Sequence, residues 1–359
     1  MKKYRIGLIG AGSISNVYMQ SMQRVPEGEV VAVWSRSLER ARRFAAEHGL
    51  EHATDRVATL VEAVDVVCVN SPNARHAEHA IEAARAGCHV IVEKPLAASV
   101  DQAQSILDAC ASAGVGLAYA EELPFVPKFV RARDLLRSGV LGDVVYITQR
   151  EAHAGPHSSW FFDRDEAGGG VLMDMACHSI ECVRWLIEKR PVERVTAQIS
   201  RTRHRDRTDL DDHAVVTLDF EGGITALCES SWALVGGMQS RLEIWGTEGY
   251  LAVDLLGETG IHVYTPTGRQ DEFLTPGWNR PTPEWVYDNG YPQELSHFLR
   301  CFAQGHLPDE SGEDGLRVLE ILCAAYASAR EGRAIALPFD ASGVERAVDL
   351  WHADRRDRA

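Results

Sequence analysis

Apolar residues in the first third of the chain alternate between short continuous runs and longer stretches with helical spacing. The continuous runs are rich in valine and isoleucine and predict five strands, at 4–10, 29–35, 64–71, 88–95 and 115–122. Between them, apolar positions three and four residues apart predict four helices, at 13–25, 37–49, 75–87 and 99–114. Strict alternation of strands and helices indicates a parallel sheet with helices on both faces. We therefore predict a doubly wound α/β domain of the Rossmann type at residues 1–122.

The pattern changes from about residue 123. Helical spacing predicts three helices, at 127–139, 168–187 and 313–332, and apolar runs predict strands within 142–153, 192–203, 211–234, 240–255 and 261–268. Strands that follow one another without intervening helices indicate an antiparallel sheet. We expect residues 123–359 to form an α+β domain with a large, mostly antiparallel open sheet. Its last helices can pack back on the first domain, and a charged tail closes the chain at 352–359.

The composition is that of a globular protein, with 45% hydrophobic and 25% charged residues among 359. The formal net charge of −15 argues against nucleic acid or an anionic membrane as partner, because both require a clustered positive face. The eight cysteines are scattered and mostly lie in apolar runs, which indicates reduced core residues. No run is long enough to span a membrane, and the short N-terminal run breaks at glycines, so we expect a cytoplasmic protein that binds a small molecule.

A glycine-rich turn follows the first predicted strand and opens the first predicted helix. Gly10, Gly12 and Ser15 have the spacing of the dinucleotide-binding fingerprint, with serine at the third position. Gly10 suits the tight turn, and Gly12 lets a pyrophosphate approach the backbone. The helix start at Ser13 and Ile14 offers amides and a dipole to its negative charge. The turn therefore predicts an NAD(P)-binding site.

The end of the second strand bears on the choice between NAD and NADP. Many NAD-binding domains of this type carry an acidic residue there, which holds the ribose 2′-hydroxyl. This chain has Ser35 and Arg36, with Arg40 nearby, so no carboxylate repels a 2′-phosphate and an arginine is placed to pair with it. We therefore favour NADP over NAD. The alternative is that Arg36 stacks on the adenine and does not discriminate.

Polar residues also follow the strands at 64–71 and 88–95. Because these strand ends share the carboxyl edge of the sheet, we expect the cofactor to contact Asn70, Ser71, Pro72, Asn73, His76, Glu93 and Lys94. Two alternatives are that Asn73 only caps the helix and that His76 lies on its outer face. Lys94 ends an apolar strand before a proline, and lysine is rarely buried without a partner. We predict that its ammonium group points into the crevice.

Asp174 and His178 stand four residues apart behind the glycines at 168–170, in an otherwise apolar helix. Residues at this spacing share one helix face. Oxidation of a secondary alcohol requires removal of the hydroxyl proton, and a histidine suits that task, so we predict His178 as general base. Asp174 then orients the imidazole or binds a neighbouring hydroxyl, and Lys94 donates to the reacting oxygen. Lys94 is itself the alternative base if burial and the positive nicotinamide lower its pKa.

The glycine-rich turn, SPNARH, EKP and GGGVLMDMACH occur in this order along the chain. In this combination the chain resembles the Gfo/Idh/MocA family, named for glucose-fructose oxidoreductase and inositol dehydrogenase, over nearly its whole length. The resemblance implies an NAD(P)-dependent dehydrogenase or reductase acting on a sugar, glycoside, polyol or cyclitol. It places catalysis at Lys94, Asp174 and His178. It also implies a homodimer or homotetramer assembled through the open face of the second sheet.

Two segments suit a carbohydrate. Where many members have asparagine, arginine and phenylalanine after the fifth strand, this chain has acids, which suit sugar hydroxyls, and an aromatic ring with polar neighbours precedes the glycine run. The predicted substrate contacts are Glu121, Glu122, His153, His157, Trp160, Asp174 and His178. Four of these, His153, His157, Asp174 and His178, can in principle converge on zinc. No pair has a dedicated metal spacing and hydride transfer needs no metal, so we predict none.

Two other functions remain open at this stage. A hydrolase or lyase can retain its cofactor and oxidise the substrate only transiently, so that a neighbouring leaving group becomes easier to expel. A cofactor-bound sensor without turnover belongs to a different class of protein. The complete set of Lys94, Asp174 and His178 favours the oxidoreductase over the sensor.

Overall fold

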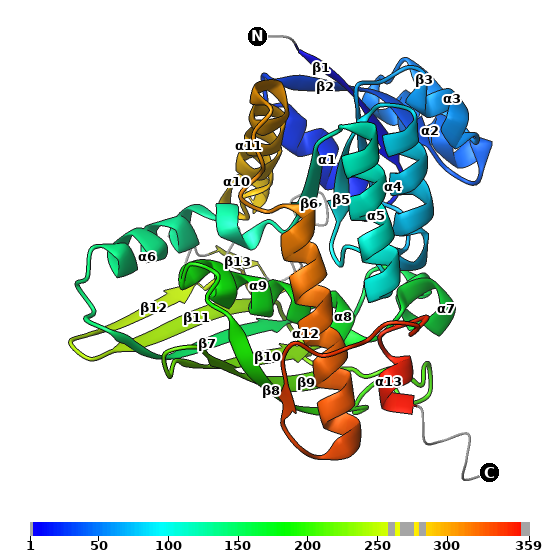
Figure 1. The fold of residues 1–359 in the computed structure, drawn as a ribbon. Helices are drawn as coiled ribbons and strands as arrows, with labels where there is room; N and C mark the ends of the chain where they lie inside the picture. Colours follow the sequence, from blue (N-terminus) through cyan, green and yellow to red (C-terminus); the bar gives the residue numbers. More distant parts are fainter. Residues whose placement is uncertain (1–2, 258–262, 266–275, 280–284, 353–359) are drawn as a thin grey trace.

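Two sheets, one in each half of the chain, organise the protein (Figure 1). The computed structural model describes residues 3–257, 263–265, 276–279 and 285–352. The first sheet has six parallel strands flanked by helices, and the second has seven mostly antiparallel strands. The predicted combination of a Rossmann domain with an open-sheet α+β domain is confirmed.

The first sheet has the order β3-β2-β1-β4-β5-β6, and every neighbouring pair is parallel. Its strands are β1 (Tyr4–Ile9), β2 (Gly28–Trp34), β3 (His52–Thr54), β4 (Val66–Val69), β5 (His89–Glu93) and β6 (Leu117–Ala120). The connecting elements are α1 (Ser13–Met22), α2 (Leu38–His48), α3 (Val57–Val61), the short 3-10 helix η1 (Asn73–Arg75), α4 (His76–Arg85) and α5 (Val100–Ala113). The strand order reverses between β1 and β4, which in such sheets marks the ligand crevice at the carboxyl ends.

The elements β3 and α3 are missing from the sequence-based prediction. Each spans at most five residues, and β3 carries no apolar run. Periodicity needs a longer window than this, so neither segment gives a helical or strand signal. Strand β3 extends the sheet edge beyond β2, and α3 connects it to β4.

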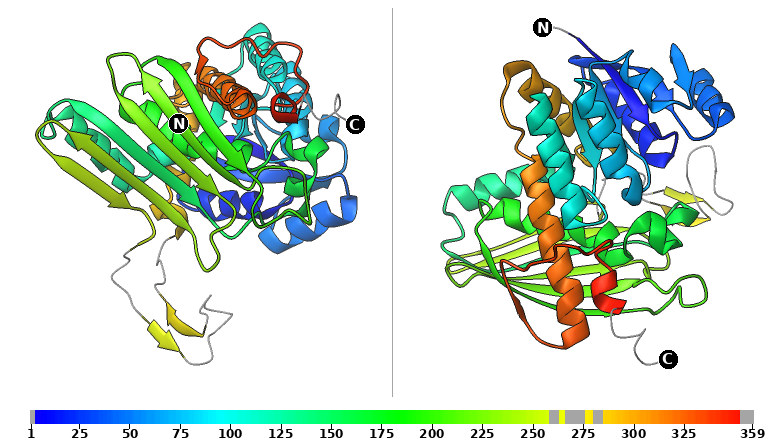
Figure 2. Two further views of the ribbon diagram at one scale, coloured as in Figure 1. Left: turned by 90° about the horizontal axis from the view of Figure 1, so that it is seen from below. Right: turned by 45° about the vertical axis from the view of Figure 1, so that its right-hand side comes forward.

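The second sheet has the order β12-β11-β7-β10-β9-β8-β15. Its strands are β7 (Val144–Ala152), β8 (Val192–Ser200), β9 (His213–Phe220), β10 (Thr225–Ser231), β11 (Gln239–Gly246), β12 (Tyr250–Asp254) and β15 (Ile335–Ala336). Only β7 and β10 pair in parallel; the other neighbours are antiparallel. Buried residues alternate along β9 and β11, as expected when helices cover one face. Among the described residues, no helix covers the other face (Figure 2, left).

The helices of the second half differ in part from the prediction. They are α6 (Pro127–Arg137), α7 (Arg164–Ala167), α8 (Val171–Asp174), α9 (Ala176–Leu186), α10 (Trp285–Asp288), α11 (Tyr291–Gln304), α12 (Gly312–Glu331) and α13 (Asp349–His352), with 3-10 turns η2 (Leu123–Phe125) and η3 (Ser159–Phe162). The single helix predicted behind the glycines is divided at Met175 into α8 and α9. Strands β13 (Val263–Thr265) and β14 (Gly277–Asn279) pair antiparallel as a separate two-stranded sheet. The rest of the strand predicted at 261–268, and the tail at 353–359, lie outside the described residues.

The last long helices pack against the first domain. Leu295, Phe298 and Leu299 of α11 share a buried cluster with Tyr18 of α1 and Ile6 of β1. Helix α12 lies beside α5 and also covers β8 of the second sheet (Figure 1). All eight cysteines are free and buried, as predicted. Among the described residues, no helix is long and apolar enough to cross a membrane.

Candidate active site

The glycine-rich turn has the geometry of a dinucleotide site. Gly10 has a φ of +124°, and a Cβ there would lie 2.5 Å from the backbone oxygen of Asn70, so only glycine fits. At Gly12 a Cβ would meet no described atom within 4 Å, and no side chain caps the start of α1. The Ser15 hydroxyl donates to the Gly10 oxygen (2.8 Å) and accepts from Asn70 Nδ2 (3.1 Å). Free space beside uncapped amides fits a pyrophosphate.

At the end of β2 the structure places an acidic side chain that is distant in sequence. Arg40 Nε donates to the Ala11 oxygen (3.2 Å), so this side chain braces the glycine-rich turn. Ser35 is buried and its hydroxyl accepts from the Ser37 amide (3.4 Å). Arg36 is largely exposed, and its Nη1 lies 3.8 Å from Oε1 of Glu166 in α7. The prediction that no carboxylate repels a 2′-phosphate here was made from the end of β2, and the structure adds Glu166 from the other domain beside Arg36.

The turn after β4 is held by its own polar side chains. Asn73 Nδ2 donates to the Ala167 oxygen (2.9 Å) and does not cap the helix. His76 is 1% exposed, and its ring nitrogens lie 2.9 Å from the Pro95 oxygen and 2.8 Å from the Ser71 oxygen. Placement of His76 on the outer face of its helix is therefore wrong. It ties the turn at Ser71 to the segment after Lys94, and burial lowers its pKa.

Lys94 and Asp174 meet where β5 ends against α8. Lys94 Nζ donates to Oδ1 of Asp174 (3.0 Å) and to its backbone oxygen (2.9 Å), and Trp232 Nε1 donates to Oδ2 (2.9 Å). Burial opposes the ammonium charge, but the carboxylate more than offsets this and raises the pKa of Lys94. Burial likewise opposes the charge of Asp174, and Lys94 holds the pKa of this carboxyl below its usual range. The lysine is thus an ammonium donor, which counts against its role as base.

Glu93, the residue before Lys94, is a buried acid whose side chain pairs with Tyr18 and not with the Lys94 ammonium group. Tyr18 donates its hydroxyl to Oε1 of Glu93 (2.8 Å), and the Lys94 amide donates to Oε2 (3.2 Å). Burial raises the pKa of Glu93 to about 8. The acid therefore links α1 to the strand end that presents the lysine.

His178 lies at the start of α9, a helix whose residues are all buried. Its Nδ1 lies 2.8 Å from Oε1 of Glu121 and 3.6 Å from Oε2 of Glu122. Burial raises the pKa of Glu121 to about 8 and lowers the pKa of His178 to about 4. Glu121 therefore orients the imidazole. Asp174 was predicted either to orient the imidazole or to bind a neighbouring hydroxyl, and in the structure Glu121 takes the first of these roles. Because Glu121 is fully buried, its predicted contact with the sugar is not available in this structure.

The other predicted substrate residues lie at different depths. His153 is buried and its Nε2 lies 3.8 Å from Oδ2 of Asp174, whereas His157 is exposed and stacks 5.8 Å from the His153 ring. Trp160 is half-buried and stacks on Phe161, with ring centroids 3.7 Å apart. Of these three residues, His153 is the one that lies beside Asp174 in the cluster around Lys94.

One group near the site has the composition of a metal centre. Ligand atoms of Glu121, Cys177 and His178 lie within 4.8 Å of one another. The Cys177 thiol donates to the Asp174 oxygen (3.2 Å), and burial raises its pKa well above the usual value, which disfavours the thiolate that zinc requires. We retain the prediction that the site works without a metal.

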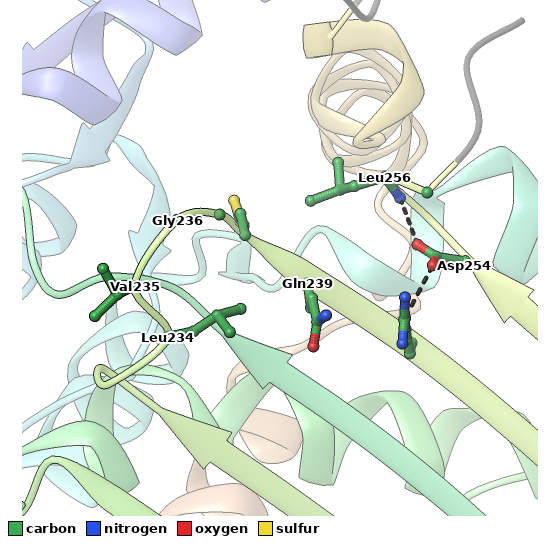
Figure 3. A pocket seen from close by; sticks show the side chains of 10 residues that line it. Leu234, Val235, Gly236, Gln239, Asp254 and Leu256 are labelled. Carbon is green, nitrogen blue, oxygen red and sulfur yellow. Dashed lines mark hydrogen bonds and ion pairs between the residues drawn. The ribbon is translucent and has the colours of Figure 1, made fainter. Parts of the chain in front are cut away.

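A pocket of about 210 Å³ lies at the start of β11 (Figure 3). Its wall includes Leu234, whose amide donates to the His153 oxygen (3.2 Å), and the loop begins at Trp232, which donates to Asp174. On the far wall the Asp254 carboxylate accepts from Arg241 Nε (2.9 Å) and the Leu256 amide (3.2 Å). One loop therefore lines both the pocket and the cluster.

Comparison with known proteins identifies the family of the chain. The model of the oxidoreductase family with an NAD-binding Rossmann fold matches residues 4–121, and that of the GFO/IDH/MocA C-terminal domain matches residues 129–252. The chain belongs to the Gfo/Idh/MocA family. Both halves of the resemblance noted in the sequence are thereby confirmed.

Similar members of the Gfo/Idh/MocA family span almost the full chain. 1,5-Anhydro-D-fructose reductase of Ensifer adhaerens is 30% identical, over 92% of this chain and 97% of that protein. Myo-inositol 2-dehydrogenase of Thermotoga maritima is 28% identical, over 93% and 98%. The crystal structure of GenD2 from gentamicin A biosynthesis in complex with NAD superposes with a TM-score of 0.90 at 30% identity, covering 94% and 97%.

Proposed function

We propose that the protein is an NAD(P)-dependent oxidoreductase that transfers hydride between the nicotinamide and a secondary alcohol or ketone of a sugar, glycoside or cyclitol. The observation that carries this is the meeting of Lys94, Asp174 and the Glu121–His178 pair beside the carboxyl edge of a sheet whose first turn fits a pyrophosphate. The names of the similar enzymes support the substrate class. When bound, the cofactor supplies the hydride acceptor or donor.

The side chains divide the proton chemistry between them. The Lys94 ammonium donates to the reacting oxygen and stabilises its developing charge, while Asp174 keeps the lysine charged and in place. With its Nδ1 proton held by Glu121, His178 presents Nε2 as the base that takes the hydroxyl proton. Trp232 fixes the second oxygen of Asp174, so its carboxylate cannot rotate away from Lys94.

For the cofactor, we propose NADP over NAD. Ser35 and Arg36 stand where an acid would hold the 2′-hydroxyl of NAD, and Arg36 can pair with a 2′-phosphate. We assign contacts on the nicotinamide side to the turn at Asn70–Asn73 and to Lys94, with His76 as a positioning residue. We also propose that the protein is cytoplasmic.

One experiment tests the function. The purified protein is examined by native mass spectrometry for retained cofactor, then incubated with NAD or NADP and a panel of sugars and cyclitols while absorbance at 340 nm is followed. We expect an exchangeable cofactor and accumulation of its reduced form. Product without net reduced cofactor would point to the hydrolase or lyase, and binding without any turnover to the sensor.

The open face of the second sheet supports a homodimer or homotetramer. Tyr146, Trp245 and Tyr250 form an aromatic row there, with ring centroids 5.2 Å apart in both neighbouring pairs. Aromatic residues on an uncovered sheet face are typical of protein interfaces.

Trp245→Glu is expected to convert the oligomer to monomers, because burial of an unpaired charge in the interface is unfavourable. Light scattering after gel filtration measures the mass. Leu307→Glu is the control, since Leu307 is 83% exposed on the loop between α11 and α12. Dissociation by the control alone, or an unchanged mass for Trp245→Glu, contradicts this interface.

A further inference from the structure

The short helix α7 of the second domain reaches the place where the adenosine ribose of a dinucleotide lies. That ribose sits at the end of the second strand in domains of this type, which here is Ser35 and Arg36. Glu166 of α7 comes within 3.8 Å of the Arg36 guanidinium. Its other oxygen, Oε2, is buried and has no hydrogen-bond partner among the described residues.

The position of Glu166 is fixed by contacts on both sides of it. Asp163 caps α7 by accepting from the Asp165 amide (2.9 Å), and Arg164 pairs with Asp349. The Ala167 oxygen accepts from Asn73 Nδ2 (2.9 Å), which ties the end of α7 to the turn after β4. Glu166 is therefore held near Arg36 by its own backbone, with only its side-chain rotations left free.

The two possible ligands differ in charge at this place. A 2′-phosphate paired with Arg36 brings about two negative charges close to the Glu166 carboxylate, and like charges at such distances repel. The 2′-hydroxyl of NAD is neutral and can donate to a carboxylate oxygen. Arg36 and Glu166 therefore act in opposite directions on the same phosphate.

We propose that Glu166 is a cofactor-discriminating residue, supplied by the second domain, that disfavours the 2′-phosphate of NADP. This inference rests on the proposed use of NAD(P) and concerns only the balance between its two forms. Arg36 favours NADP and Glu166 opposes it, so the size of the preference for NADP depends on both residues.

The test compares dissociation constants of NAD and NADP, measured by isothermal titration calorimetry without substrate. Glu166→Gln keeps the size of the side chain and removes its charge, and we expect it to tighten NADP binding about ten-fold while NAD binding changes less than about two-fold. Asp165→Asn is the matched control: it removes a charge from the same short helix, but Asp165 pairs with Arg346 and not with Arg36. The control should leave both constants within about two-fold.

The outcomes separate the two proposals. If the unaltered protein binds neither dinucleotide, the proposed function fails and this inference fails with it. If both bind and Glu166→Gln leaves the ratio of the two constants unchanged, or weakens NADP binding, only the role of Glu166 is overturned. Weaker NADP binding by Glu166→Gln would show that Glu166 holds Arg36 in place for the phosphate.

Discussion

Lys94→Met is expected to lower kcat/KM for sugar oxidation about a thousand-fold while leaving the cofactor dissociation constant within about three-fold. Methionine keeps the length and apolar stem of the side chain but removes the charge that lies 3.0 Å from Asp174. The variant loses stabilisation of the developing alkoxide, and it leaves the buried Asp174 carboxylate with Trp232 and the more distant His153 beside it but without the lysine charge. The loss should therefore exceed that of one ordinary hydrogen bond.

The measurement is steady-state reduction of the cofactor together with calorimetric cofactor binding. Lys128→Met is the control, because among the described residues Lys128 donates to the backbone oxygens of Asp254 and Leu255, at the end of β12 and away from Lys94. Thermal unfolding of both variants shows whether they fold. Retention of more than about a tenth of the activity by a folded Lys94→Met protein would exclude a direct role at the reacting oxygen.

The second large effect concerns the Glu121–His178 pair and pH. Burial raises the pKa of Glu121 to about 8 and lowers that of His178 to about 4. The Glu121–His178 pair therefore takes up one proton as the pH falls through about 8, and it loses that proton above this pH. Only the form that has lost this proton accepts another from the substrate. We therefore expect kcat/KM for oxidation to rise through about pH 8, and the rate of ketone reduction, which needs the proton, to fall through the same range.

Variants assign that ionisation. His178→Asn should lower oxidation about a thousand-fold and abolish the rise, and Glu121→Gln should displace the rise from pH 8. Glu151→Gln is a matched control, because burial also raises the pKa of Glu151 to about 8 but its carboxylate bonds to Ser240 and Gln149. If the midpoint of the pH dependence of kcat/KM moves in Glu151→Gln and stays unchanged in Glu121→Gln, the assignment of this ionisation to the Glu121–His178 pair is contradicted.

The first domain could be predicted because its signals are local. Each strand and helix of the Rossmann domain longer than five residues carries its own apolar pattern, and the turn at Gly10 and Gly12 is read from adjacent residues. Helix α11 is absent from the sequence-based prediction although it carries a comparable signal at Leu295, Phe298, Leu299 and Phe302. The break at Met175 leaves no mark in the apolar spacing.

The site could be predicted only as far as its motifs extend. Lys94, Asp174 and His178 stand in recognisable sequences, but the partners that set their charge and orientation come from distant positions. Trp232 is 58 residues from Asp174, and Glu121 is 57 from His178. The position of Glu166 beside Arg36 depends on how two domains pack. No periodicity or spacing encodes these pairings, because they arise from the tertiary fold.

A crystal structure of the protein with its dinucleotide and a sugar that it oxidises tests the central claim most directly. We predict that the hydroxyl that loses hydride to the nicotinamide C4 lies within hydrogen-bond distance of both Lys94 Nζ and His178 Nε2. We also expect Glu121 to remain on Nδ1 of the same imidazole. A sugar bound with its reacting hydroxyl away from Lys94 and His178 would contradict the roles assigned to these residues.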